Sequence, residues 1–146
     1  MVTGAARGIG FGTAQALARR GAAVVVVDLD SGAAESAAAQ LPGQALGLAA
    51  DVTDRGAMQR VIATVTERSG GVDVVVANAG VASRAATVRA MNGEAVDRVL
   101  AVNLGGVYNT VITALPQIAA RGGHVVVTSS IYAFVNGLGT APYAMA

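Results

Sequence analysis

Three glycines near the start of the chain, Gly4, Gly8 and Gly10, lie in the run TGAARGIG between a short apolar stretch and a stretch typical of a helix. A glycine at the first position permits a tight turn, the second lets the backbone approach a phosphate, and the third allows close packing of helix on strand. The N-terminus of the following helix offers free N–H groups to an anion. The loop predicts a pyrophosphate site, although a glycine-rich turn without a ligand would show the same pattern.

A carboxylate, Asp28, stands 18 residues after Gly10 at the end of a second apolar stretch. At this distance from a glycine loop, a carboxylate can accept hydrogen bonds from the hydroxyl groups of an adenosine ribose. Its charge, to which Asp30 adds, would repel a 2′-phosphate, so NAD is favoured over NADP as the cofactor. Arg7, directly before Gly8, argues in the other direction, because a guanidinium can pair with a phosphate. The alternative for Asp28 is a solvated carboxylate without a ligand.

The elements that would position these residues alternate between short β-branched runs and longer alanine-rich stretches. Strands are predicted over 2–3, 23–28, 45–50, 72–77 and 124–129, and helices over 8–20, 33–40, 53–68, 93–120 and from 141 onward. This alternation predicts an α/β fold with a doubly wound, parallel, Rossmann-like sheet in one domain, 1–146. The last strand would be an exposed apolar edge. We therefore expect the sheet to be incomplete and to lack its last strands.

The composition argues against several kinds of partner. Only 13% of the residues are charged, and the ten basic residues are all arginines spread along the chain, so no nucleic-acid surface is expected. No cysteine occurs and His124 is the single histidine, so no metal site is expected. The apolar runs are shorter than the roughly 20 residues of a membrane span, and no signal peptide precedes the glycine loop. We expect a cytoplasmic protein with no membrane partner.

The chain resembles the short-chain dehydrogenase/reductase family from residue 3 to residue 143, and would form the N-terminal part of that family's NAD(P)-binding domain. The run 3–10 is similar to the family's TGxxxGxG motif and 78–80 to its NAG motif, while 51–52 resembles the pair that contacts the adenine. The loop and these motifs together predict a set of cofactor-binding residues: Thr3, Gly4, Arg7, Gly8, Ile9, Gly10, Asp28, Asp51, Val52, Asn78, Ala79 and Gly80.

The resemblance also implies a catalytic site. Asn103 matches the family's helix asparagine, and Ser130 lies 13 residues before Tyr143, which is the family's spacing. The implied reaction is reversible hydride transfer between the nicotinamide and a carbonyl or secondary alcohol. Tyr143 would be the general acid and base, Ser130 would hydrogen-bond the substrate oxygen, and Asn103 would hold a water in the proton relay.

Two departures from the family pattern bear on activity. The family's catalytic lysine would stand at position 147, directly after Ala146, and the first strand is short, so we expect a chain truncated at both ends. In the family that lysine lowers the pKa of the tyrosine. The alternatives are therefore a catalytically inactive nucleotide-binding fragment and an NADP-dependent carbonyl reductase. The apolar stretch 131–138 suggests a hydrophobic substrate, and the family usually forms dimers or tetramers.

Overall fold

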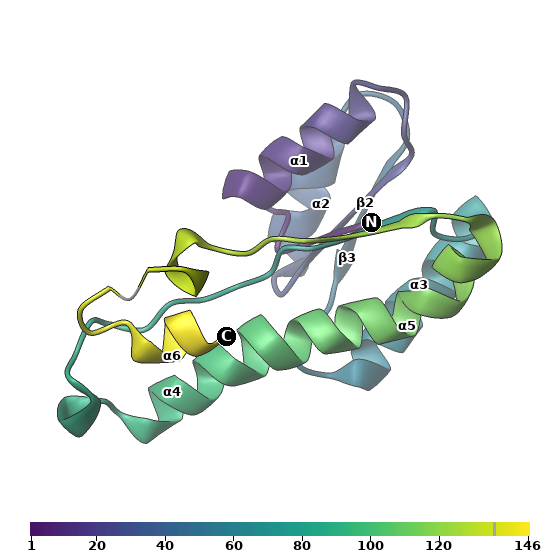
Figure 1. The fold of residues 1–146 in the computed structure, drawn as a ribbon. Helices are drawn as coiled ribbons and strands as arrows, with labels where there is room; N and C mark the ends of the chain where they lie inside the picture. Colours follow the sequence, from purple (N-terminus) through teal and green to yellow (C-terminus); the bar gives the residue numbers. More distant parts are fainter. Residues whose placement is uncertain (136) are drawn as a thin grey trace.

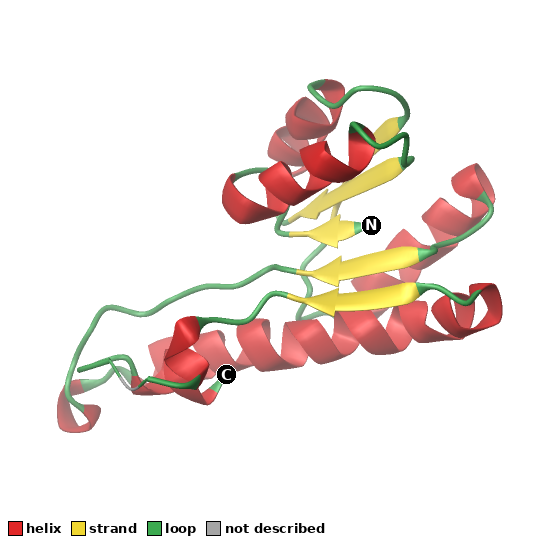
Figure 2. Cartoon of the chain, turned by 45° about the horizontal axis from the view of Figure 1, so that its top comes forward, coloured by secondary structure: helices red, strands yellow, loops and turns green. Residues whose placement is uncertain are grey.

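A single parallel sheet forms the centre of the molecule, in a computed structural model that describes residues 1–135 and 137–146. Its strands lie in the order β3–β2–β1–β4–β5 (Figures 1 and 2). They are β1 Val2–Thr3, β2 Val24–Asp28, β3 Ala45–Ala49, β4 Val74–Ala77 and β5 His124–Val127. All the pairings are parallel, so the predicted doubly wound α/β sheet is confirmed.

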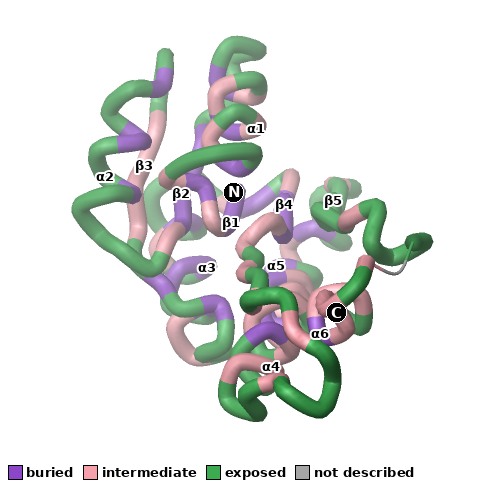
Figure 3. Tube along the Cα trace, turned by 90° about the vertical axis from the view of Figure 1, so that its left-hand side faces the viewer, coloured by how far each residue is buried: buried purple, intermediate pink, exposed green. Residues whose placement is uncertain are grey.

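Helices cover both faces of this sheet because side chains of a buried strand alternate between its faces. Val24 and Val26 pack with α1 (Gly8–Ala18) and α2 (Ser31–Ala39) in one core cluster. Val25 and Val27 pack with α3 (Arg55–Ser69) and α5 (Val107–Arg121) in the other. Figure 3 shows the two groups of helices on opposite sides of the strands. The continuous apolar run of β2 is thus explained by burial on both faces.

The helix predicted over 93–120 is present but is not uniform. It runs through α4 (Gly93–Leu100), a π-helical turn η2 (Ala101–Gly106) and α5. By length and composition it could cross a membrane, a criterion that core helices of globular proteins also meet, and here it packs against α3 and β4. The short helices η1 (Val88–Ala90), η3 (Ile131–Ala133) and α6 (Ala141–Met145) complete the fold.

Several predicted boundaries were too wide by one or two residues. The fourth strand begins at Val74 rather than residue 72, because the N–H of Val72 donates to the side chain of Gln117 instead of to a neighbouring strand. The fifth strand ends at Val127, and Thr128 makes one further backbone bond to Ala77 before the chain leaves the sheet. This strand lies at the edge, and Val127 is 49% exposed, as the sequence led us to expect.

Helix α1 lies close to the first loop because Gly10 has no side chain. A Cβ atom at Gly10 would come within 2.5 Å of Asn78 Nδ2 and 2.9 Å of Ala5 Cα. Gly12, two residues further along the same helix, faces open space, since no atom lies within 4 Å of its Cβ position. Packing therefore requires a glycine at position 10 but not at position 12.

We expect Gly10→Ala to lower the free energy of unfolding by about 1–3 kcal/mol, because the methyl group overpacks the contact with Ala5 and Asn78. The control Gly12→Ala should raise it by about 0.5–1 kcal/mol through helix propensity. Urea titration followed by circular dichroism measures both values. Equal changes in the two variants would show that Gly10 is not a packing position.

Candidate nucleotide-binding and catalytic cavity

A cavity of about 910 Å³ opens at the carboxyl ends of the strands. Its volume lies in the range of about 300–1,000 Å³ that is usual for ligand pockets. It spans the place where the strand order changes direction, between β1 and β4, which is where open α/β sheets bind ligands. Loops that follow all five strands line it, together with α4, η2 and α6. All the predicted site residues except Thr3 and Gly8 are among its lining residues.

The glycine loop adopts the backbone that its sequence predicts. Gly4 and Gly8 have φ values of 61° and 59°, in the left-handed region that favours glycine. A Cβ at Gly4 would lie 2.7 Å from Ala79 Cα, so this position brings the loop against the segment after β4. Arg7 precedes α1 and lines the cavity, and no described side chain caps the helix. The first N–H groups of α1 are thus available to an anion.

Asp28 joins the end of β2 to the glycine loop. Its Oδ2 accepts a hydrogen bond from the N–H of Ala6 at 2.9 Å, and its Oδ1 accepts one from the N–H of Leu29 at 2.8 Å. A carboxylate has about four lone-pair positions, so acceptor capacity remains for ribose hydroxyl groups. The sequence predicted a ligand-binding role for the carboxylate, which stays a prediction, and did not indicate that it holds the loop.

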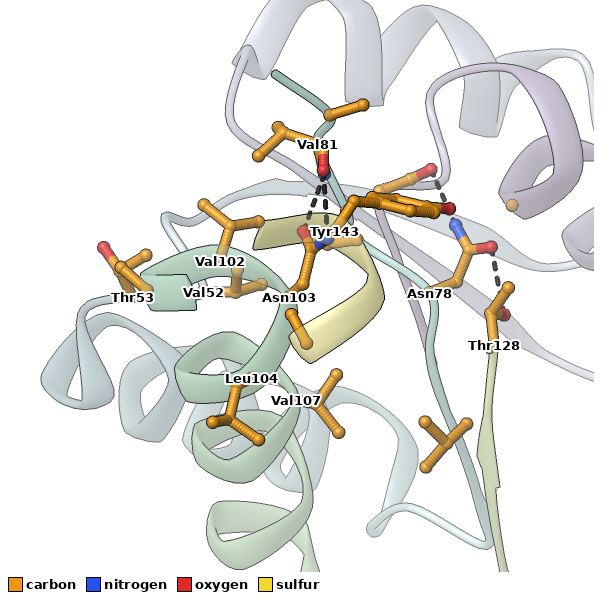
Figure 4. A pocket seen from close by; sticks show the side chains of 18 of the residues that line it. Val52, Thr53, Asn78, Val81, Val102, Asn103, Leu104, Val107, Thr128 and Tyr143 are labelled. Carbon is orange, nitrogen blue, oxygen red and sulfur yellow. Dashed lines mark hydrogen bonds between the residues drawn. The ribbon is translucent and has the colours of Figure 1, made fainter. Parts of the chain in front are cut away.

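Asn78 connects three strands at the base of the cavity. Its Nδ2 donates to the carbonyl oxygens of Thr3 at 3.0 Å and Gly4 at 3.2 Å, and its Oδ1 accepts from Thr128 Oγ1 at 3.2 Å (Figure 4). Thr3 is 1% exposed, and its hydroxyl accepts from the N–H groups of Asn78 and Ala79. Thr3 therefore lies behind the cavity wall, which explains why it does not line the cavity.

The loop after β3 is folded on itself by Asp51. One carboxylate oxygen, Oδ1, accepts from both the N–H and the hydroxyl of Thr53, each at 2.8 Å. Val52, between them, is 7% exposed and packs into the core below the sheet. All three residues line the cavity on the same side as Asp28, because β3 pairs with β2.

Asn103 lies in the π-helical turn and holds the loop after β4. Its Oδ1 accepts from the N–H of Val81 at 2.8 Å, and its Nδ2 donates to the carbonyl of the same residue at 2.9 Å (Figure 4). π-helical turns are frequent at functional sites because they displace one residue from the regular helix pattern. The side chain positions the cavity wall, and its expected role in a proton relay stays a prediction.

Ser130 and Tyr143 approach the cavity from the segment after β5. Ser130 precedes η3, and its Oγ accepts from the N–H of Tyr132 at 3.3 Å. Tyr143 is half-buried in α6, and its ring meets the ring of Tyr132 edge to face, with centroids 5.9 Å apart. The structure thus brings Ser130 and Tyr143, two of the three predicted catalytic residues, to the cavity that Asp28 also lines. Ser130 follows the edge strand β5, whereas Asp28 ends β2 in the other half of the sheet.

Two aspartates with displaced pKa values, Asp54 and Asp73, lie outside the cavity. The N–H of Ala57 lowers the pKa of Asp54, the residue that caps α3, and the Arg121 guanidinium lowers the pKa of Asp73 at a distance of 2.6 Å. Among the described residues, no three histidine, cysteine, aspartate or glutamate side chains are close enough together to hold a metal ion. The polar chemistry of the cavity therefore comes from hydroxyl, amide, carboxylate and guanidinium groups.

Sequence reasoning missed part of the cavity lining. Leu29 and Val81 line the cavity, and each directly follows a predicted site residue. Their places just after the ends of two strands were a signal in the sequence that could have identified them. Arg98, Val102 and Val107 also line it from the long helix. Their contribution depends on how the helix is rotated about its axis, which no pattern in the sequence indicated.

Known proteins share both the sequence and this architecture. The family described as short chain dehydrogenase matches residues 1–146. An uncharacterized oxidoreductase of Mycobacterium bovis is 38% identical over 149 residues, covering 100% of this chain and 60% of the relative. Galactitol 2-dehydrogenase of Agrobacterium fabrum is 37% identical over 133 residues, covering 86% and 50%. The solved structure of 3-ketoacyl-(acyl-carrier-protein) reductase from Brucella melitensis complexed with NADH is 30% identical, with a TM-score of 0.92 over 99% of this chain and 62% of that one.

The chain thus spans 60% of the length of the Mycobacterium relative and 50% of the Agrobacterium relative. Within that span, the family match covers every residue from the glycine loop to α6. The parallel sheet and its helices agree with the fold of the solved structure. The chain belongs to the short-chain dehydrogenase family.

Proposed function

We propose that the protein is an NAD-dependent oxidoreductase that transfers hydride between the cofactor and a carbonyl or secondary alcohol. The observation that carries this proposal is the arrangement of different functional groups along one cavity. The glycine loop and Asp28 lie at one side, and Ser130 and Tyr143 lie at the other. A dinucleotide needs an acceptor for its adenosine ribose, an anion site for its pyrophosphate and a reacting end, in this order along the molecule. The donor and acceptor groups present fit such a molecule.

Each side chain has a distinct role in this proposal. The N–H groups at the start of α1 bind the pyrophosphate, and the free lone pairs of Asp28 accept from the adenosine ribose. The nicotinamide, when bound, supplies or accepts the hydride. The Tyr143 hydroxyl passes a proton to or from the substrate oxygen, and the Ser130 hydroxyl donates a hydrogen bond to the same oxygen. Asn103 keeps the wall between them in place through Val81.

The substrate class follows from the side chains near the catalytic end. Ile131, Phe134 and Leu138 follow Ser130 in the chain, and they are 73%, 90% and 100% exposed. A group of exposed apolar side chains on one short segment is typical of a binding surface. We propose a substrate with an apolar substituent, acted on in the cytoplasm by a dimer or tetramer, without nucleic acid or membrane.

Replacing the carboxylate of Asp28 tests the choice of cofactor. Asp28→Asn removes the charge and one acceptor, so we expect NADH to bind about tenfold more weakly and NADPH to bind more tightly. The matched control is Asp30→Asn, because Asp30 caps α2 outside the cavity and asparagine is an equally good cap. Calorimetric titration of the unmodified protein and of both variants with both cofactors gives the six affinities.

Two outcomes of this titration would contradict the proposal. Tighter binding of NADPH than of NADH by the unmodified protein would favour the NADP-dependent reductase, with Arg7 as the phosphate partner. Absence of binding of either cofactor to folded protein would show that the cavity does not take a dinucleotide.

Removing the Tyr143 hydroxyl tests the catalytic end. Tyr143→Phe should lower the turnover of a secondary alcohol by about 10²–10⁴-fold, since it removes the general acid and base, while the affinity for NADH stays within about twofold. Tyr132→Phe is the control, because this neighbouring ring does not line the cavity, and its turnover should change by less than about threefold. Equal losses in the two variants would mean that Tyr143 acts only through packing. If the unmodified protein binds NADH without turnover, it is the inactive nucleotide-binding form.

A further inference from the structure

A buried asparagine that the proposed reaction does not use, Asn109, lies on α5 beneath the loop after β3. It is 8% exposed. Its Nδ2 donates to the carbonyl oxygens of Val52 at 3.0 Å and Thr53 at 3.1 Å. These two carbonyl groups are consecutive in the loop, 57 and 56 positions before Asn109 in the sequence. Both residues line the cavity. A single amide therefore fixes the direction of this stretch of cavity wall.

The rest of the Asn109 side chain is also engaged. Its Oδ1 accepts from Arg55 Nε at 3.1 Å. The guanidinium of Arg55 lies over the ring of Tyr108, 5.3 Å from the centroid, and this contact limits its own freedom. The amide consequently has one orientation, with its donor group toward the two loop carbonyls. A buried amide with all of these bonds satisfied holds its partners more firmly than an exposed one.

A second contact on the same side of the helix brings α5 against the loop. Gly106 lies three residues before Asn109, which places both residues on one face of the helix. A Cβ at Gly106 would come within 2.5 Å of Val52 Cγ2. The absence of a side chain at this position lets the helix backbone approach closely enough for the Asn109 amide to reach the carbonyl groups.

The strand order identifies which end of the cavity this loop serves. β3 is next to β2, which carries Asp28, whereas Ser130 follows β5 at the opposite edge of the sheet. Figure 4 shows Val52 and Thr53 on one side of the cavity and Asn78 and Thr128 on the other. The loop that Asn109 holds is therefore on the Asp28 side of the cavity, away from the strand that Ser130 follows.

We propose that Asn109 is a positioning residue for the adenosine end of the cofactor site. It acts through the carbonyl groups of Val52 and Thr53, which set the width of the cavity beside Asp28. The inference rests on the proposed function, because it needs a dinucleotide in the cavity. It predicts that loss of the amide weakens ligands that contain adenosine and spares ligands that contain only the nicotinamide half.

The sharpest test is Asn109→Asp. The two side chains have the same shape, and the carboxylate keeps its bond from Arg55, but it places an acceptor against the carbonyls of Val52 and Thr53. We expect NADH and ADP-ribose to bind about tenfold more weakly, and reduced nicotinamide mononucleotide to stay within about twofold. Calorimetry measures all three affinities on the purified protein.

The matched control is Gln117→Glu, on the same helix. Gln117 also bridges elements through its amide: its Nε2 donates to Thr66 Oγ1, and its Oε1 accepts from the N–H of Val72 at 2.9 Å. It does not line the cavity. This variant should lose stability in a thermal melt without any change in the three affinities. The comparison separates a local effect on the adenosine site from a general loss of stability.

A milder variant keeps the test valid if Asn109→Asp does not fold. Asn109→Ser retains a small acceptor for Arg55 and loses the reach to the two carbonyls, and it should weaken NADH about threefold with the same ligand selectivity. Equal weakening of all three ligands, or unchanged affinity for NADH and ADP-ribose, would overturn the inference and leave the proposed function intact. Failure of the unmodified protein to bind NADH would overturn both.

Discussion

The amide of Asn78 joins three strands at the point where the sheet changes direction, and the cavity depends on that junction. It binds the carbonyls of Thr3 and Gly4 on β1 and its loop, and it accepts from Thr128 after β5. Parallel strands supply no such cross-links beyond their ends, where the backbone groups must find other partners. Because Gly10 leaves room for this amide beside α1, the glycine loop, the sheet and the first helix share one set of contacts.

Side-chain bonds to backbone are the common means by which the cavity walls are held. Asp28 binds the N–H of Ala6, Asp51 binds Thr53, and Asn103 binds both backbone groups of Val81. Each of these loops lies outside regular structure, so its backbone groups have no strand or helix partner. Short polar side chains therefore serve two purposes in this protein, since they stabilise the loops and line the cavity.

Much of the fold and of the proposed site could be predicted from the sequence because the two depend on local patterns. The apolar runs that became β2 and β4 indicated strands, and the glycine loop with Asp28 predicted where a nucleotide would bind. What could not be predicted depends on long-range geometry. The hydrogen bond from the N–H of Ala6 to Asp28 depends on how separate elements pack, and so does the contribution of Arg98 to the cavity lining. The strand limits at Val74 and Val127 likewise depend on a side chain from another element and on the edge position.

The long helix shows most clearly why spacing alone was insufficient. A uniform helix over 93–120 would keep a rotation of about 100° per residue throughout its length. The π-helical turn accommodates one extra residue. The part of the helix after Gly106 is therefore rotated by about 100° about the helix axis relative to the part before Ala101. This shift allows Asn103 to face the loop after β4 while Asn109 faces the loop after β3. One helix thereby holds two walls of the cavity, and Gly106 is the position of the sequence that lets it approach Val52.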